Sequence, residues 1–137
     1  MEVLPCLQQL FPLSFIKKMA LLEDLRVYKI AMEIGESVYA ITIEWDFFNQ
    51  KGLGDQFLRA ADSIALNIAE GYGRYHYKEN KNFCWYARGS LCETKTANQK
   101  VYNRKLISKE EYESILSKLL ECHLLLNSYI KNIGKAQ

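Results

Sequence analysis

Basic side chains recur along residues 78–105 with a spacing that suits phosphate binding. This segment has seven basic and two acidic residues, a local net charge of +5, whereas the whole chain carries only +2. Lys81, Arg88 and Lys95 lie seven residues apart, and such positions drift by only about 20° per heptad around an α-helix. They therefore form one stripe. The candidate phosphate contacts are Arg74, Lys78, Lys81, Arg88, Lys95, Lys100, Arg104 and Lys105.

Solvation or ion pairing is an alternative interpretation of the same charges. Residues 24–50 carry five acidic and two basic residues, a local net charge of −3. These acids would pair with the bases of residues 78–105, either within one chain or between subunits, and a charged helix face also stays solvated without any ligand.

In a ring of subunits the basic stripe would recur around the axis, and each phosphate contact would add affinity by releasing counterions.

A row of polar side chains lies on the helix expected at residues 55–72. Ser63, Asn67 and Glu70 share one face, together with Arg59. One interpretation is a binding groove. The favoured one is a polar network or subunit interface that fixes helix register, with Glu70 pairing with Arg88, because buried charges need partners.

Aromatic side chains gather around residues 72–86. Next to basic residues they would stack nucleic-acid bases, although such clusters more often anchor a core or an interface. Trp85 is offset from the face that carries Phe83 and Tyr86, so we expect Trp85 to make an intersubunit contact.

Catalytic and metal-binding patterns are weak. The four cysteines form no Cys-x-x-Cys pair, and we expect them to be reduced and packed. His76 and His123 have no second ligand pair at metal spacing, and the chain has no Glu-x-x-His motif of di-iron bundles. The Gly71-Tyr72-Gly73 segment lacks the preceding strand of a dinucleotide site. The sequence therefore predicts no enzyme, no metal and no cofactor.

Four helices must position these side chains. Apolar residues recur every three or four positions over residues 24–49, 55–72, 78–104 and 108–133. Asp24 is the expected first N-cap, residues 49–54 read as a loop, Ser108 and Glu111 fit a capping box, and Gly134 fits a helix stop. Short connections predict an all-α, antiparallel up-down-up-down four-helix bundle.

The bundle domain is expected at residues 21–137. Residues 1–20 would be an N-terminal extension, either disordered or upstream of a true start at Met19. No apolar run is long enough to span a membrane, and the order of apolar and basic residues does not fit a signal peptide, so we expect a cytoplasmic protein without membrane contact.

Three motifs resemble a known family. Residues 24–28 read DLRVY, residues 59–74 read RAADSIALNIAEGYGR and residues 86–93 read YARGSLCE. In this order they resemble the 23S ribosomal RNA intervening-sequence proteins. That resemblance implies a left-handed four-helix bundle assembled as a homopentamer. The family is similar to the accessory variability determinant proteins of diversity-generating retroelements, pentamers that bind a reverse transcriptase and nucleic acid.

Two functions remain open from the sequence. The first is a non-enzymatic homo-oligomer that serves as a nucleic-acid-associated accessory or scaffold, with RNA or DNA on the basic stripe. The alternative is a protein–protein interaction module or structural oligomer that binds no nucleic acid. The implied partners are further copies of the chain, RNA or DNA, and a reverse transcriptase or another protein.

Overall fold

The computed structural model describes residues 7–135, except the side chains of residue 7 and residues 17–20. Every regular element in this part of the chain is helical, which confirms the all-α class. In order the elements are α1 (Leu7–Leu10), α2 (Leu13–Asp24), α3 (Arg26–Thr42), α4 (Phe47–Asn49), the π-type turn η1 (Gln50–Gly54), α5 (Asp55–Tyr72), α6 (Tyr77–Asn103) and α7 (Lys109–Asn132). None of the helices in residues 7–135 is both long and apolar enough to cross a membrane.

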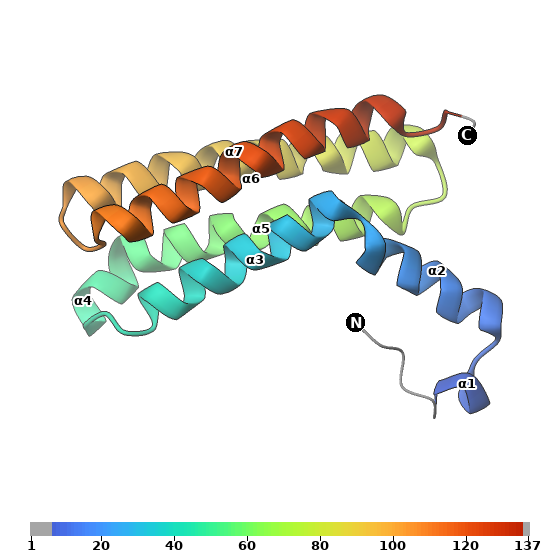
Figure 1. Ribbon diagram of the computed structural model, residues 1–137, viewed down its shortest axis with the longest axis horizontal. Coiled ribbons are helices and arrows are strands. Elements are labelled where there is room, and N and C mark those ends of the chain that lie inside the picture. Colours follow the sequence, from blue (N-terminus) through green and yellow to red (C-terminus); the bar gives the residue numbers. More distant parts are fainter. Residues whose placement is uncertain (1–6, 136–137) are drawn as a thin grey trace.

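The four long helices pack in a closed cycle. Helix α3 packs against α5 and α7, and α6 packs against the same two helices. Successive long helices run in opposite directions, with α3 and α5 on one side of the molecule and α6 and α7 on the other (Figure 1). Helices α3 and α6 therefore lie diagonally across the core. The side formed by α3 and α5 and the side formed by α6 and α7 are therefore opposite each other.

The core is built from side chains that recur at helical spacing. Apolar residues at i, i+3, i+4 and i+7 share one face of a helix, and that face is buried here. Fully buried positions include Ile34, Phe57, Ile64, Ile68, Leu91, Ile115, Leu119 and Leu126.

Two glycines bring α5 close to both of its neighbours. A Cβ atom on Gly35 of α3 would lie 2.6 Å from Asp62 Oδ1 of α5, and one on Gly71 of α5 would lie 2.9 Å from the Asn80 carbonyl oxygen of α6. At Gly71 the nearby atom belongs to the backbone, so only glycine permits this approach, whereas at Gly35 it is the end of the Asp62 side chain, which can move, and the Asp62 backbone is 3.8 Å away. The Gly71 contact therefore fixes the height at which α5 faces α6.

The predicted ends of α7 are confirmed. Ser108 Oγ accepts a hydrogen bond from the Glu111 N–H, and the Glu111 carboxylate accepts one from the Ser108 N–H, which completes the capping box. Gly134 has φ +81°, the left-handed conformation that ends many helices.

The single helix predicted over residues 24–49 is wrong at both ends. Asp24 is not an N-cap but the last residue of α2, and an extended Leu25 (φ −67°, ψ 121°) separates α2 from α3. Helix α3 stops at Thr42, whose Oγ1 donates to the Val38 carbonyl. The Gln50 side chain then donates to the Thr42 and Ile43 carbonyls, 3.2 and 3.0 Å away, and so stabilises the end of α3.

The predicted loop at residues 49–54 is also helical in large part. Helix α4 and η1 continue towards α5, interrupted by a kink at Gly52 (φ −82°, ψ −115°). At the other end of the chain, α1 and α2 occupy most of the predicted extension, and α2 leads away from the four long helices (Figure 1). Residues 1–6 of that extension lie outside the described residues.

Candidate functional site

The basic stripe of α6 lies along its border with α7. Arg88 Nη1 donates a hydrogen bond to Asn127 Oδ1 of α7 at 3.4 Å, and Lys95 faces a cavity that α7 also lines. Lys81 and Arg88 are half-buried, whereas Lys95 is exposed. Arg88 and Lys95 thus both lie on the α7 side of α6, and Lys81 precedes Arg88 by one heptad on the same continuous helix.

Arg88 is the best-fixed cation of the stripe. Its guanidinium carbon lies 4.4 Å from the centre of the Trp85 ring, in cation–π geometry. Trp85 itself is 45% exposed. An arginine and an indole therefore form one preassembled surface unit beside α7. The predicted intersubunit role of Trp85 stays a prediction.

A cavity of about 550 Å³ opens between α6 and α7 beyond this pair. It is lined by Cys92, Lys95, Thr96, Gln99, Lys100, Tyr112, Leu116 and His123, so two lysines face it and no carboxylate does. The Tyr112 hydroxyl donates to Gln99 Oε1 at 2.7 Å, and its ring stacks on Tyr102 with centroids 4.4 Å apart. We call this cavity the basic groove.

Arg74 is separated from the stripe by a local ion pair. Its Nη2 atom lies 2.7 Å from Glu70 Oε1, and its guanidinium lies 4.8 Å from the Phe83 ring centre. The predicted pairing of Glu70 with Arg88 is therefore wrong. Residues four apart on a helix are neighbours, so Arg74 reaches Glu70 without crossing to another helix.

The remaining predicted cations lie at the two ends of α6. Lys78 is exposed in its first turn, and Lys100 lines the basic groove. Arg104 and Lys105 are exposed in the α6–α7 connection, where Lys105 adopts φ +60°. Lys95, Lys100, Arg104 and Lys105 thus follow one another towards one end of the molecule.

The polar row of α5 makes local hydrogen bonds. Ser63 Oγ donates to the Arg59 carbonyl at 2.7 Å, and Asn67 Nδ2 donates to the Ser63 carbonyl at 2.8 Å. Arg59 and Glu70 are exposed, and Ser63 and Asn67 are half-buried. Both hydrogen bonds are accepted by backbone carbonyl groups of α5 itself, so they do not fix the register of α5 against another helix. The interface role of this row stays a prediction.

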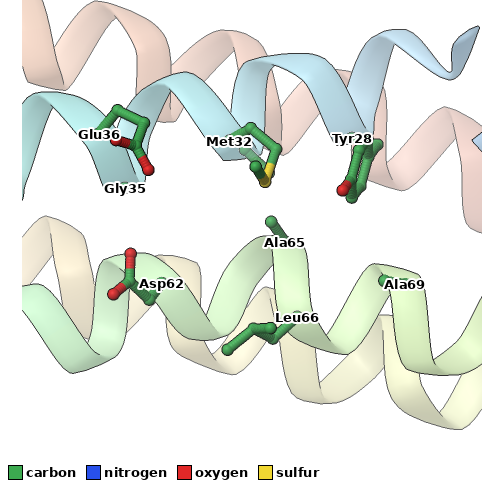
Figure 2. A pocket seen from close by; sticks show the side chains of 9 residues that line it. Tyr28, Met32, Gly35, Glu36, Asp62, Ala65, Leu66 and Ala69 are labelled. Carbon is green, nitrogen blue, oxygen red and sulfur yellow. The ribbon is translucent and has the colours of Figure 1, made fainter. Parts of the chain in front are cut away.

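A second surface lies on the opposite side, between α3 and α5. It is a groove of about 300 Å³ lined by Tyr28, Ala31, Met32, Gly35, Glu36, Asp62, Ala65, Leu66 and Ala69. Figure 2 shows Met32 and Leu66 beside it and the carboxylates of Glu36 and Asp62 at one end, from facing helices. Met32 is 42% and Leu66 67% exposed. We call it the acidic groove.

The carboxylates of the acidic groove form no ion pair with the described residues. None of the ion pairs between described residues involves Glu36 or Asp62. Burial, and secondarily the charge of Glu36, raise the pKa of the Asp62 carboxyl. This groove was not predicted from the sequence. Its small residues were visible in the sequence, but the meeting of Glu36 with Asp62 depends on how α3 packs against α5, which the sequence alone does not show.

Thiol and metal chemistry find little support here. Burial raises the pKa of Cys84 to about 11 and that of Cys122 to about 12, so both thiols stay protonated and unreactive. Cys92 is exposed, which corrects the expectation that all the cysteines are packed. Within residues 7–135 no group of three or more His, Cys, Asp or Glu side chains is placed to hold a metal ion.

The fold and these surfaces define an all-helical protein that carries a basic groove and an acidic groove on opposite sides. The chain belongs to the 23S rRNA-intervening sequence protein family, whose model matches residues 23–128. It is similar to a crystal structure from Bacteroides thetaiotaomicron, described as a protein of unknown function from the S23 ribosomal protein family. That likeness has a TM-score of 0.69 and 25% sequence identity, and covers 77% of this chain and 98% of the other. No match was found among curated proteins.

Proposed function

We propose that the protein is a non-enzymatic, homo-oligomeric scaffold that associates with RNA or DNA in the cytoplasm. Each subunit would be an antiparallel up-down-up-down four-helix bundle, and the family resemblance favours five subunits. The basic groove carries this proposal, because two lysines face a cavity of about 550 Å³ that no carboxylate lines. A strand of nucleic acid would place phosphates against Lys95 and Lys100 and continue past Arg104 and Lys105.

The chemistry of the grooves supports a binding role over catalysis. The acidic groove offers carboxylates, a phenol and apolar groups, but no His, Cys, Ser or Lys side chain lines it. The basic groove has Cys92 and His123 in its lining but no carboxylate to orient the imidazole. Neither groove therefore combines a nucleophile with a base and a third group that orients the base.

Salt-dependent binding of a single strand tests the proposal. Fluorescence anisotropy with a labelled 20-nucleotide RNA and its DNA equivalent should show an affinity that falls as salt rises, because phosphate contacts release counterions. The variant Lys95→Glu/Lys100→Glu/Arg104→Glu should lose about tenfold or more in affinity. If all three residues contact phosphates, the slope of log K against log salt should fall by about 2.

A matched triple variant separates a local site from bulk charge. Lys29→Glu/Lys131→Glu/Lys135→Glu changes the net charge equally at exposed positions away from the basic groove. It should retain most of the affinity. Equal losses in both triple variants, or an affinity insensitive to salt, would refute the proposed nucleic-acid site.

The alternative function, a protein interaction module, is favoured by the acidic groove. Its exposed Met32 and Leu66, and its two carboxylates that pair with no described base, suit a protein surface that carries a cation beside apolar groups. A reverse transcriptase, suggested by the similarity to retroelement accessory proteins, is one such partner. Direct binding of a purified reverse transcriptase to the wild type, lost in a Glu36→Lys/Asp62→Lys variant, would favour this function.

A further inference from the structure

We infer that the acidic groove is the docking site for a second copy of this chain, which presents its Trp85–Arg88 unit to Glu36 and Asp62. This inference rests on the homo-oligomer proposed above and names its contact surfaces. The resulting contact is head-to-tail, because two different surfaces of the same chain meet.

The chemistry of the groove sets what can fill it. Covering the exposed Met32 and Leu66 would bury apolar surface and favour association. The same contact would take Glu36 and Asp62 out of water, which is costly unless a cation with several hydrogen-bond donors reaches them. The occupant must therefore combine an apolar or aromatic body with a cation.

The Trp85–Arg88 unit has this combination. The indole is partly exposed, and the guanidinium already lies over it at 4.4 Å. Asn127 accepts one hydrogen bond from Nη1, which leaves further N–H groups of the planar fork for carboxylates. No ion pair between described residues occupies Arg88. Lys81, one heptad earlier on the same flank, adds a second cation.

The two surfaces lie at nearly the same height along the bundle. Gly71 of α5 faces Asn80 and Phe83 of α6. Because these helices are antiparallel, moving nine residues back to Asp62 corresponds to residues 89–92 of α6, within about one turn of Arg88. A cyclic assembly whose axis is parallel to the helices involves no translation along that axis, so its contacting patches must share one height.

The surfaces also face away from each other. The α3–α5 and α6–α7 sides are opposite, so one copy can use both at once (Figure 1). Helices α3 and α6 are diagonal, and this explains why the acids of α3 make no ion pair with the bases of α6 within the chain. Lys95 lies about 10 Å beyond Arg88, and Lys100, Arg104 and Lys105 lie further along. These cations remain available to phosphate beside the contact.

Charge exchange between the two surfaces tests the inference. Variant A is Glu36→Lys/Asp62→Lys, and variant B is Lys81→Glu/Arg88→Glu. Light scattering coupled to size exclusion should show an oligomer for the wild type and a monomer for each variant alone. An equimolar mixture of A and B should reassociate into dimers and larger species in which A and B alternate, because the basic α6 flank of A meets the intact acidic groove of B, and the acidic α6 flank of B meets the charge-reversed acidic groove of A. A ring of five cannot alternate, so the size of the mixed species should differ from that of a wild-type pentamer.

Two controls keep the outcome unambiguous. Glu44→Lys/Glu110→Lys reverses two exposed acids away from both surfaces and should leave the oligomer intact. The neutral variant Glu36→Gln/Asp62→Asn keeps the shape of the groove and should weaken association about tenfold or more, with an unchanged helical circular dichroism spectrum. A monomeric wild type would overturn both the proposed oligomer and this inference. An oligomeric wild type whose variants A and B also stay oligomeric, or a mixture that stays monomeric, would overturn this inference alone.

Discussion

Asp62 lies where its own charge is unfavourable to the isolated subunit. Burial and the nearby Glu36 raise its pKa, so the folded chain binds this proton more tightly than the unfolded chain does. For an acid with a raised folded pKa, stability falls as pH rises through the window between the unfolded and folded values. At neutral pH the charge of Asp62 therefore destabilises the monomer, and an arginine from a second copy would offset that cost.

We expect Asp62→Asn to stabilise the monomer at pH 7. The gain should be no more than about 0.5 kcal/mol, because the side chain is largely exposed and its interactions are screened. Urea unfolding of the protein with and without Asp62→Asn, both in the Lys81→Glu/Arg88→Glu background that we expect to be monomeric, measures this difference in the free energy of unfolding. The difference should vanish below about pH 3, where the wild-type carboxyl is protonated in both states. A variant less stable than its parent at pH 7 would contradict the assignment.

Cys92 is the thiol that we expect to react in the folded state. Cys84 and Cys122 are fully buried with pKa values of about 11 and 12, whereas Cys92 is exposed at the basic groove. In a Cys6→Ser background, which removes a thiol outside the described residues, a colorimetric thiol reagent at pH 8 should titrate one fast group. Adding denaturant should release two more. Three fast thiols without denaturant would show that the core around Cys84 and Cys122 opens readily.

The end of α6 shows how a helix terminus is made without glycine. The Leu106 N–H donates to the Val101 carbonyl at 2.9 Å and the Lys105 N–H to the Tyr102 carbonyl at 3.0 Å, the two bonds of a Schellman motif. Lys105 takes the left-handed position at φ +60°, where glycine is usual. Its Cβ atom makes this conformation costly by about 1 kcal/mol.

We therefore expect Lys105→Gly to stabilise the protein by about 0.5–1 kcal/mol, since relief of the backbone strain outweighs the added freedom of the unfolded chain. Lys105→Ala removes the same charge but keeps the Cβ atom, so it should change stability by less than about 0.5 kcal/mol. Chemical denaturation of both variants makes the comparison. Equal stability of the two would refute the strain at this position.

Helix ends were predictable where their signals are local. The Ser108–Glu111 capping box and Gly134 specify the ends of α7 within a few residues of sequence. The boundaries of α3 could not be predicted in this way, because its N-cap is a leucine without a side-chain hydrogen bond. Its C-terminal carbonyls are bound by Gln50, seven or eight residues away, across a turn whose geometry the sequence does not reveal.

At the scale of the whole molecule, the all-α class followed from apolar periodicity, and the common flank of Lys81, Arg88 and Lys95 followed from heptad spacing. The acidic groove did not follow, because it depends on the packing of α3 against α5 that brings Glu36 and Asp62 to one end of the same groove. The predicted pairing of Glu70 with Arg88 was wrong, although the spacing of four residues that joins Glu70 to Arg74 is visible in the sequence.

The opposite placement of the Trp85–Arg88 unit and the acidic groove gives the subunit a direction, like a tile whose plug is the Trp85–Arg88 unit and whose socket is the acidic groove. Each added copy leaves a socket identical to the one just filled, so the surfaces themselves impose no limit on growth. Only the angle between successive copies decides whether the last plug returns to the first socket or the series continues as a fibre. A substitution that changes the angle between copies without weakening their contact would therefore replace a closed ring by fibres. The viscosity of the protein solution would then rise with concentration.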